Sequence, residues 1–280
     1  MAKYDSLTFT DDFMFSHILK ANPDLCASIL SLLLPWPVED IVVLNREYEI
    51  RVTPDGKGVR FDIYLKDNAK KIYSIEMLNY YENHLPFRSR YYQAASDMEQ
   101  LERGASYCEL TDSIIIFISS VKNAMPDRAI STYKRICLEN RNEELGDGTT
   151  IMFVNPWGKR DNINKETGYF LDYLKGLPAA DPLTSRIDLA LQSARQNTIW
   201  RSNYMTLEEH YERKRLEGVE QGLKQGLKQG VKQGISQGID MNKKELRAIL
   251  DKGKAEGLSV EEIYKQLEES ITSDTQTVEK

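Results

Sequence analysis

The spacing of hydrophobic and polar positions near the amino terminus predicts two helices. Residues 8–11 contain two threonines and an aspartate, the composition of a helix cap, and they precede an apolar-rich run over residues 12–20. Residues 24–34 place their aliphatic side chains on one strongly apolar helical face. The prolines in residues 35–37 are expected to end this second helix.

Three segments with the pattern of strands follow these helices. Residues 41–52 are apolar at first and alternate later, and residues 59–66 and 72–78 are rich in β-branched and aromatic side chains. Residues 54–58 contain proline and glycine, and residues 67–71 are polar. Both short segments are typical of turns, so we expect them to connect the three strands.

The middle of the chain continues with alternating helix and strand. Residues 86–103 have the composition of a helix. Residues 113–118 and 150–155 are continuous apolar runs, which are typical of strands buried on both faces. The order of helices, three strands, a helix, a strand and one more strand predicts a single α/β unit that extends to about residue 160.

Two carboxylates, Asp62 and Glu76, lie near the centres of consecutive predicted strands. If residues 67–71 close an antiparallel hairpin, Lys66 lies opposite Ile72, and the same register places Asp62 opposite Glu76. Opposed residues on one face have Cβ atoms about 4.5–5.5 Å apart, where like charges destabilise the sheet. A divalent cation between the carboxylates would remove this repulsion. A solvated strand face, or a register shifted by one residue, is the alternative explanation.

The carboxyl-terminal part of the chain has a different pattern. Residues 184–214 form a long polar-rich segment that is expected to be helical. Residues 219–238 repeat a tetrapeptide in which the first residue is aliphatic and the last is glycine. Four residues advance a helix by about 400°, so each stripe of the repeat drifts by about 40° per repeat. Such a period favours right-handed winding if helices pair along it. Glycine costs about 0.8–1.0 kcal/mol relative to alanine at each helical position.

This repeat has two interpretations. It is either a glycine-lined helical seam of coiled-coil type, which would make the protein a homo-oligomer through residues 219–239, or a flexible spacer. The regular aliphatic residue favours the seam, because a spacer does not need it. Residues 242–250 and 259–267 predict a small helical hairpin, whose second helix begins with a capping-box pattern. Residues 272–280 are expected to be disordered.

Composition limits the class of protein. The chain has 280 residues, of which 41% are hydrophobic and 29% charged, as is usual for a globular protein with a sizeable core. We find no apolar run of about 18 residues and no signal peptide, so we expect a cytoplasmic protein without a membrane partner. The three cysteines and three histidines are scattered along the sequence. This spacing predicts reduced thiols and no zinc site.

The net charge of -6 argues mildly against a protein that coats nucleic acid, although an enzyme needs only a local basic surface. Residues 84–92 combine cations with aromatic side chains. Arg88 and Arg90 can pair with phosphate, and Tyr91 can stack on an unpaired base. These three residues are our candidates for nucleic-acid binding. The alternative is a helix start whose arginines pair with neighbouring acids.

Five segments, in this order, carry a family resemblance: residues 8–15 (TFTDDFMF), 59–64 (VRFDIY), 73–77 (YSIEM), 88–93 (RSRYYQ) and 144–149 (ELGDGT). With them the chain, from its amino terminus to about residue 215, resembles the Rpn-type family of recombination-promoting nucleases or transposases. This family belongs to the PD-(D/E)xK nuclease superfamily.

The resemblance implies an α/β fold. Its core would be restriction-endonuclease-like, with the element order αβββαβ and a mixed central sheet, followed by a helical C-terminal region. We accordingly expect five parts, which are a nuclease-like domain (1–183), a long helical extension (184–217), a glycine-rich repeat helix or linker (218–240), a small helical hairpin (241–271) and a disordered tail (272–280).

The resemblance also implies a chemistry. Asp62 and Glu76, with the backbone carbonyl of Met77, would bind Mg²⁺ or Mn²⁺, and no small-molecule cofactor would be needed. Such a metal polarises the scissile phosphate and lowers the pKa of a bound water. The implied function is that of a metal-dependent DNA endonuclease associated with recombination or mobile elements. Glu49 would join the acids only if residues 54–58 close their hairpin symmetrically, and a plain surface acid is the other explanation.

One position departs from the family pattern. Two residues after the second acid, the superfamily has lysine and Rpn-like proteins usually have glutamine, but this chain has Leu78. Lys66 and Gln93 are the candidates to supply the missing polar group, and we take Gln93 as a third candidate catalytic residue. A general base or orienting group contributes about 10²–10⁴-fold to a rate. The sequence therefore leaves a second function open, that of a catalytically weakened or inactive relative that binds DNA or forms oligomers.

Overall fold

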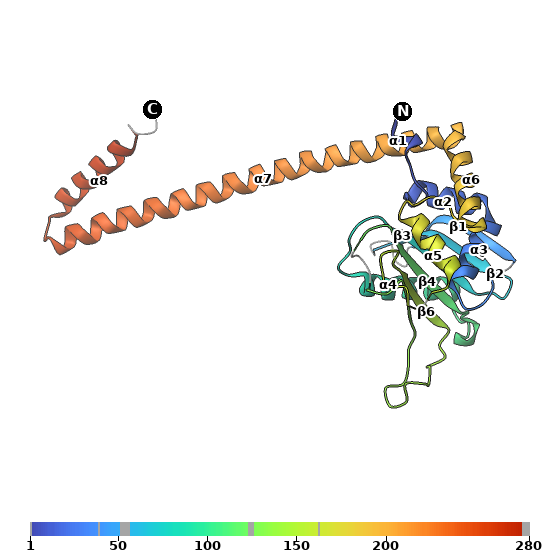
Figure 1. The fold of residues 1–280 in the computed structure, drawn as a ribbon. Coiled ribbons are helices and arrows are strands. Elements are labelled where there is room, and N and C mark those ends of the chain that lie inside the picture. The colour runs from blue at the N-terminus through green and yellow to red at the C-terminus, as the bar shows by residue number, and fades with distance from the viewer. Residues whose placement is uncertain (1, 39, 51–56, 123–125, 162, 276–280) are drawn as a thin grey trace. The chain divides into compact units, whose positions relative to one another are not determined.

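The computed structural model describes residues 2–38, 40–50, 57–122, 126–161 and 163–275. The chain divides into two units, of which the first ends at Met205 and the second begins at Thr206. The first unit contains a six-stranded sheet with the strand order β1-β2-β3-β4-β6-β5 (Figure 1). The strands are β1 (Ile41–Ile50), β2 (Val59–Asp67), β3 (Ile72–Leu78), β4 (Ser113–Ser119), β5 (Ile130–Tyr133) and β6 (Thr149–Val154).

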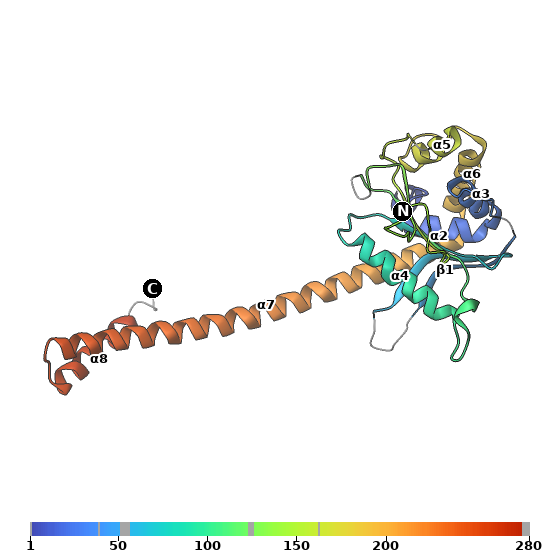
Figure 2. The same cartoon turned by 90° about the horizontal axis from the view of Figure 1, so that it is seen from below.

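The sheet is mixed, as expected. β1, β2 and β3 are antiparallel neighbours, whereas β3, β4 and β6 run parallel and β5 pairs with β6 in the antiparallel sense. Every residue of β3 and β4 is buried, because helices cover these central strands on both faces. Helix α4 lies on one face, and α2, α3, α5 and α6 gather on the other (Figure 2).

The helices of the first unit begin with the short α1 and end in the long α7, which continues into the second unit. They are α1 (Ala2–Asp5), α2 (Asp12–Ala21), α3 (Pro23–Leu33), α4 (Leu85–Gln100), the short 3₁₀ turn η1 (Tyr107–Glu109), α5 (Lys165–Leu174), α6 (Pro182–Gln196) and α7 (Thr198–Ala255). The order α2-α3-β1-β2-β3-α4-β4-β6 contains every element that the hydrophobic pattern predicted for the core. The sequence-based fold class is therefore confirmed.

Helices α1 and α5 were not among the predicted elements, and two further details of the first unit differ from the prediction. Strand β5 was not expected, because it is a short edge strand of mixed polarity and carries no periodic signal. Residues 184–214 were expected to form one helix, but α6 ends at Gln196 and α7 begins at Thr198. Asn197 makes this break. Its side-chain oxygen accepts the backbone N–H groups of Ile199 and Trp200 at 3.0 Å each, which caps the new helix.

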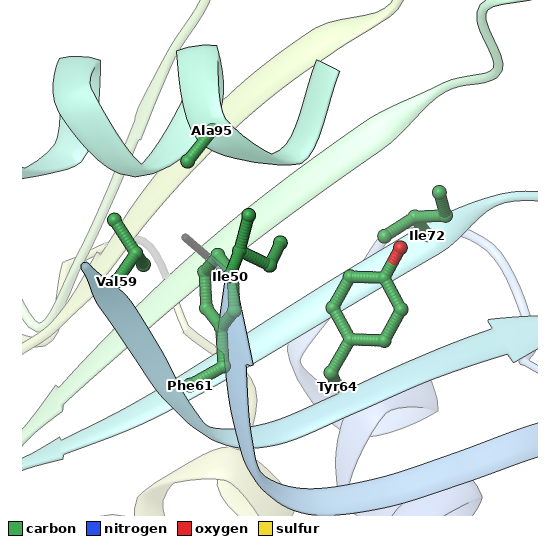
Figure 3. Packing of buried hydrophobic residues seen from close by; sticks show 6 residues of the cluster. All are labelled: Ile50, Val59, Phe61, Tyr64, Ile72 and Ala95. Carbon is green, nitrogen blue, oxygen red and sulfur yellow. The ribbon is translucent and has the colours of Figure 1, made fainter. Parts of the chain in front are cut away.

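A cluster of buried residues fixes α4 against the antiparallel part of the sheet (Figure 3). Phe61 and Tyr64 of β2 both belong to this cluster, together with Ala95 of α4. Residues three apart on a regular strand point to opposite faces, so β2 must be irregular between Phe61 and Tyr64. On the neighbouring strand, Glu47 lies between the partners of Phe61 and Ile63 and has a φ of 51°. The unusual backbone conformation thus lies at Glu47 of β1, at the position opposite Asp62.

The second unit consists of the rest of α7 and of α8 (Val260–Thr275). The whole repeat of residues 219–238 is helical, and its aliphatic side chains are exposed, for example Leu223 at 70% and Leu227 at 72%. α8 packs against the end of α7, where a Cβ atom on Gly253 would lie only 2.6 Å from Ile263, so glycine allows the close contact. The predicted hairpin is thus built from the end of α7 and from α8. Residues 272–275 belong to α8, and residues 276–280 lie outside the described part.

Among the described residues, no helix is long and apolar enough to span a membrane.

Candidate active site

The β2–β3 hairpin has the register that the sequence predicted. Lys66 lies opposite Ile72, and the ladder continues in step to the pair Ile63 and Ile75. The next pair in this register is Asp62 and Glu76, and at that point the backbone ladder stops. The two carboxylates therefore stand where the two strands cease to share main-chain hydrogen bonds.

Each carboxylate bonds to the backbone of the opposite strand in place of the missing ladder. The Asp62 N–H donates to Glu76 Oε1 at 3.1 Å, and the Met77 N–H donates to Asp62 Oδ2 at 2.9 Å. Because the N–H and C=O of one strand residue point to the same edge, the Met77 carbonyl also faces β2. The side chains thus tie the strands together and hold two acids and one carbonyl at the same opening.

Arg88 of α4 is the cation closest to these acids. Its Nη2 donates to Glu76 Oε2 at 2.7 Å and to the Tyr92 hydroxyl at 2.8 Å, and its Nη1 donates to Glu82 Oε2 at 2.8 Å. The guanidinium also lies over the rings of Tyr92 and Phe117. These contacts fix the guanidinium between a buried acid and a partly exposed one, so Arg88 is a counter-ion of the site.

A third acid, Asp12, reaches the same opening from the start of α2. Its Oδ1 accepts a hydrogen bond of 2.5 Å from Asn79 Nδ2, and the Asn79 side-chain oxygen accepts the Ser120 hydroxyl. Asn79 follows β3 directly, so it couples the end of the acid-bearing strand to the helix. Its role is to position Asp12, which no strand-pairing argument could place.

Burial and mutual repulsion disfavour the ionised forms of these acids. Burial raises the pKa of Asp62 to about 6, and the Asp12 carboxylate adds to this rise, while the bond from Met77 opposes it. Burial and the nearby Asp62 charge hold the pKa of Glu76 well above its usual value, although Arg88 partly offsets this. Burial also raises the pKa of Asp12. Two arginines, Arg88 and Arg60, offset the charge of the three acids only in part, so the opening carries excess negative charge.

Leu78 occupies the position where the sequence resemblance implied a lysine or glutamine. Its side chain is buried and packs with Leu85, Phe117 and Phe153 beneath α4. It lies on the same side of the sheet as the Glu76 carboxylate, as the alternation predicted, because Arg88 and Leu85 both come from α4. The position is therefore part of the apolar core, and the polar side chains of the opening come from other positions on β2, β3, α2 and α4.

The structure brings some of the predicted site residues together and not others. Gln93 is buried, and its Nε2 donates to Asp97 Oδ1 at 2.8 Å. Within the described residues its amide makes no hydrogen bond to Asp62 or Glu76, and its Oε1 has no partner. Lys66 lies four residues along β2 from Asp62. Among Lys66, Gln93 and Arg88, it is Arg88 that bonds to the Glu76 carboxylate.

The other predicted contacts lie at the border of the opening. The Arg90 guanidinium is stacked on the ring of Phe87, and the Tyr91 hydroxyl donates to the Lys57 carbonyl at 2.6 Å. Glu49 pairs in register with Arg60 and not with Asp62, so the symmetric closure that would have placed it beside the acids is wrong. Residues 51–56 of the connecting turn lie outside the described part.

The residues present fit a hard divalent cation of the magnesium type. In the described part of the chain, no three His, Cys, Asp or Glu side chains stand close enough to form a complete cage. Mg²⁺ does not need one, because it usually takes one or two carboxylates and keeps several waters. Asp62 Oδ1, which has no hydrogen-bond partner among the described contacts, and the Met77 carbonyl are available donors, and the excess negative charge favours a cation.

Asp12, Glu82 and Tyr92 were not singled out from the sequence. Asp12 belongs to the TFTDDFMF segment, so the motif contained it, but nothing in strand periodicity connects it to residues fifty positions away. Glu82 and Tyr92 matter only through Arg88. Two signals for them were available in the sequence. Glu82 is a charged residue in the loop after an acid-bearing strand, and Tyr92 lies four residues after Arg88 on the next helix.

Residues 10–217 match the family described as PD-(D/E)XK nuclease family transposase. Neither the comparison with curated proteins nor the comparison with solved structures gave a match. The matched segment covers the sheet, the opening with its three acids, and the first part of α7.

Proposed function

The chain belongs to the PD-(D/E)XK nuclease family of transposases, and from this premise we propose that it is a metal-dependent DNA endonuclease associated with recombination or mobile elements. The family supports a nuclease- or transposase-related role, and the opening between β2 and β3 supports the particular reaction. That reaction is phosphodiester hydrolysis, in which a water oxygen bonds to phosphorus and the bond to the leaving sugar oxygen breaks.

The observation that carries this proposal is the exchange of hydrogen bonds between Asp62 and Glu76 across the end of the ladder. Asp62 Oδ2 takes the Met77 N–H, and Glu76 Oε1 takes the Asp62 N–H. A structural salt bridge would not need both the buried Glu76 and the half-buried Asp62 here, because two like charges in register destabilise a hairpin. An arrangement that is costly for folding is expected where it serves binding.

We propose that Asp62 and Glu76, with the Met77 carbonyl, hold Mg²⁺ or Mn²⁺. Such an ion would polarise the scissile phosphate and lower the pKa of a bound water. Asp62 contributes an oxygen that is already fixed by the Met77 N–H. Arg88 holds the second Glu76 oxygen at the mouth of the opening. Asp12 increases the negative potential that attracts the ion.

The buried Leu78 favours a second candidate function, that of a weakened or inactive relative that still binds DNA. Leu78 supplies no polar group to the site and is part of the apolar cluster under α4. A protein that lacks an orienting group loses about 10²–10⁴-fold in rate. We propose Arg88 as the group that decides between the two functions, since it is the cation in contact with Glu76.

The experiment that tests the proposal is incubation of the purified full chain with supercoiled plasmid in Mg²⁺ or Mn²⁺. Asp62→Asn and Leu78→Gln are assayed beside it, and Glu49→Gln serves as the matched acid on the neighbouring strand. Metal-dependent cleavage that is lost in Asp62→Asn and kept in Glu49→Gln supports the nuclease. Cleavage by Leu78→Gln alone supports the weakened relative. Cleavage that Asp62→Asn retains contradicts both.

We further propose that the protein self-associates through residues 219–239. Six aliphatic side chains of the repeat, from Val219 to Ile239, are exposed on α7, and each is preceded by a glycine whose Cβ position is open. Adjacent stripes of small and aliphatic residues allow two helix backbones to approach closely. A second copy of the same helix offers the matching surface, so the occupant we propose is this chain itself.

A further inference from the structure

Two cavities border the ion pair between Glu82 and Arg88. The first, which we call the Phe87 cavity, has a volume of about 420 Å³, and the second, the Tyr133 cavity, has a volume of about 440 Å³. Glu82 lines both cavities, so they are neighbours. The side chains that matter in the first are Tyr80, His84, Phe87, Arg88, Tyr91 and Tyr92. Those that matter in the second are Tyr81, Pro126, Tyr133, Ile151 and Phe153.

The aromatic rings of these cavities are exposed to an unusual degree. Tyr80 is 60% exposed, Phe87 is 62% exposed, and Tyr81, Tyr91 and Tyr133 are exposed as well. Such rings contribute little to the core, and a gathering of exposed apolar surface marks a binding site. Arg88 connects the rings to the acids, because it lines the Phe87 cavity and bonds to Glu76. The aromatic surface is therefore the immediate border of the candidate active site.

The charges around the rings favour bases over phosphates as the bound groups. Duplex DNA is held mainly by cations that contact its phosphates, and this term needs several lysines or arginines. Of the two arginine or lysine side chains that line the Phe87 cavity, Arg88 is engaged by Glu76 and Glu82, which leaves the single Lys57 for a phosphate. The Arg90 guanidinium does not line the cavity and lies over the ring of Phe87. Both Asp12 and Glu82 add negative charge. Stacking does not depend on a strong positive potential, because every base has a face that a ring can cover.

We propose that the two cavities bind unpaired bases, so that the strand presented to the acids is single-stranded DNA or a locally opened duplex. Base pairs in an intact duplex cannot reach such rings, because their faces are covered by their neighbours. A strand that crosses the mouth of the opening places bases on Tyr80 and Phe87 on one side of Glu82 and on Tyr81 and Tyr133 on the other. This inference names the substrate of the proposed nuclease site and rests on that proposal for its DNA.

The test uses binding in EDTA, so that it does not depend on cleavage. The probe is a fluorescein-labelled DNA strand of about 20 nucleotides with a central 2-aminopurine, a base whose fluorescence falls when it stacks. The same strand in a duplex and as RNA are the comparison probes. Phe87→Leu and Tyr81→Leu remove one ring from each cavity and keep apolar bulk. Tyr107→Leu is the matched control, because Tyr107 is 85% exposed and lines neither cavity.

We expect the single strand to bind at least about tenfold more tightly than the duplex, with loss of 2-aminopurine fluorescence. Phe87→Leu and Tyr81→Leu should each weaken binding by about 5–150-fold, the range for removal of one stacked base contact. Tyr107→Leu should bind like the parent. Equal or tighter binding of the duplex, or parent-like affinity in both ring variants, overturns the proposal. Equal binding of RNA overturns the assignment to DNA.

The outcome is distinguishable from failure of the nuclease proposal. Ring-dependent binding of single strands without any cleavage in Mg²⁺ or Mn²⁺ contradicts the nuclease and supports the cavities. Cleavage that is lost in Asp62→Asn but shows no preference for unpaired strands, in binding or in rate, supports the nuclease and overturns the cavities. Because the substituted side chains are exposed, a thermal unfolding curve for each variant is expected to match that of the parent.

Discussion

The opening between β2 and β3 and the tetrapeptide repeat of α7 both contain residues that oppose the stability of their own region. In the opening, the buried Glu76 and the half-buried Asp62 face each other, and Arg88 and two backbone N–H groups compensate part of their charge within the same chain. In the repeat, glycine recurs at every fourth position and aliphatic side chains point into water. No described contact of residues 219–239 compensates for the recurring glycines or covers the exposed aliphatic side chains.

The two regions differ in how much of this destabilising cost the chain itself compensates. Where the chain itself supplies counter-ions, the remaining excess charge is small and specific, and it fits a small ligand such as a divalent cation. Where the chain supplies no compensation over several helical turns, as in residues 219–239, our proposal is a large partner that follows the same repeat. The first region thus supports the proposed chemistry, and the second supports the proposed self-association.

The largest expected effect is that of Asp62→Asn on the rate of plasmid cleavage. Asp62→Asn keeps an oxygen for the Met77 N–H but removes the charge, so we expect metal-dependent plasmid cleavage to fall by at least about 10³-fold, since several kcal/mol of charge stabilisation are lost. A gel assay of supercoiled plasmid measures this. Retained cleavage would mean that the opening is an ordinary structural ion pair.

The next effect concerns the compensation within the chain. Arg88→Met leaves Glu76 buried without its counter-ion, and breaking a buried pair costs about 3–5 kcal/mol. We expect a fall in melting temperature of about 6–20 °C, measured by circular dichroism at neutral pH. Arg90→Met, two positions along the same helix and on its exposed side, is the control and should change stability by less than about 0.5 kcal/mol. Recovery in Arg88→Met with Glu76→Gln would show that the charge is the cause.

The third expected effect is on self-association through the repeat. Leu223→Gln with Leu227→Gln removes two aliphatic side chains from the proposed seam, each worth about 1.5–3 kcal/mol when buried. We expect self-association to weaken by at least about 100-fold in sedimentation equilibrium, with plasmid cleavage per subunit measured in parallel. Lys224→Gln with Lys228→Gln is the matched pair on another stripe. A parent chain that is monomeric at all concentrations would contradict the seam.

A smaller effect concerns pH. Because the pKa of Asp62 is raised to about 6 in the folded chain, the folded state binds more protons than the unfolded state, and stability falls as pH rises from about 4 to about 6. Asp62→Asn removes this loss. We expect the variant to exceed the parent by about 1–3 kcal/mol at about pH 8 in EDTA and by little at about pH 4.5, as measured by urea unfolding. The opposite trend would mean that Asp62 is stabilised as an anion.

The register of β1 gives the smallest prediction. Glu49 pairs with Arg60, away from the acids. Glu49→Gln should therefore change stability by no more than about 0.5 kcal/mol and leave cleavage unaltered. A loss of cleavage comparable to that of Asp62→Asn would show that Glu49 takes part in the active site.

The sequence predicted the parts of this molecule that follow from short-range rules. The five-residue turn of residues 67–71 fixed the register of Asp62 and Glu76, and the continuous apolar runs identified β4 and β6. The pairing of Glu49 with Arg60 is two residues away from the register that closure about residues 55 and 56 would give, which leaves the surface acid as the interpretation of Glu49. β5 was missed because an edge strand carries no strong pattern. Arg88, Asp12 and Asn79 meet the acids only through packing of α4 and α2, which no periodicity describes.

The most direct test of the account is Mn²⁺ binding, followed by electron paramagnetic resonance at about pH 8, together with the melting temperature. We predict that the parent and Glu49→Gln bind one Mn²⁺ per chain and melt at a higher temperature with the ion, because binding to the folded state alone stabilises it. Asp62→Asn should do neither. A parent chain that binds no Mn²⁺, or an Asp62→Asn variant that binds it as tightly as the parent, would contradict the claim that these acids are completed by a cation.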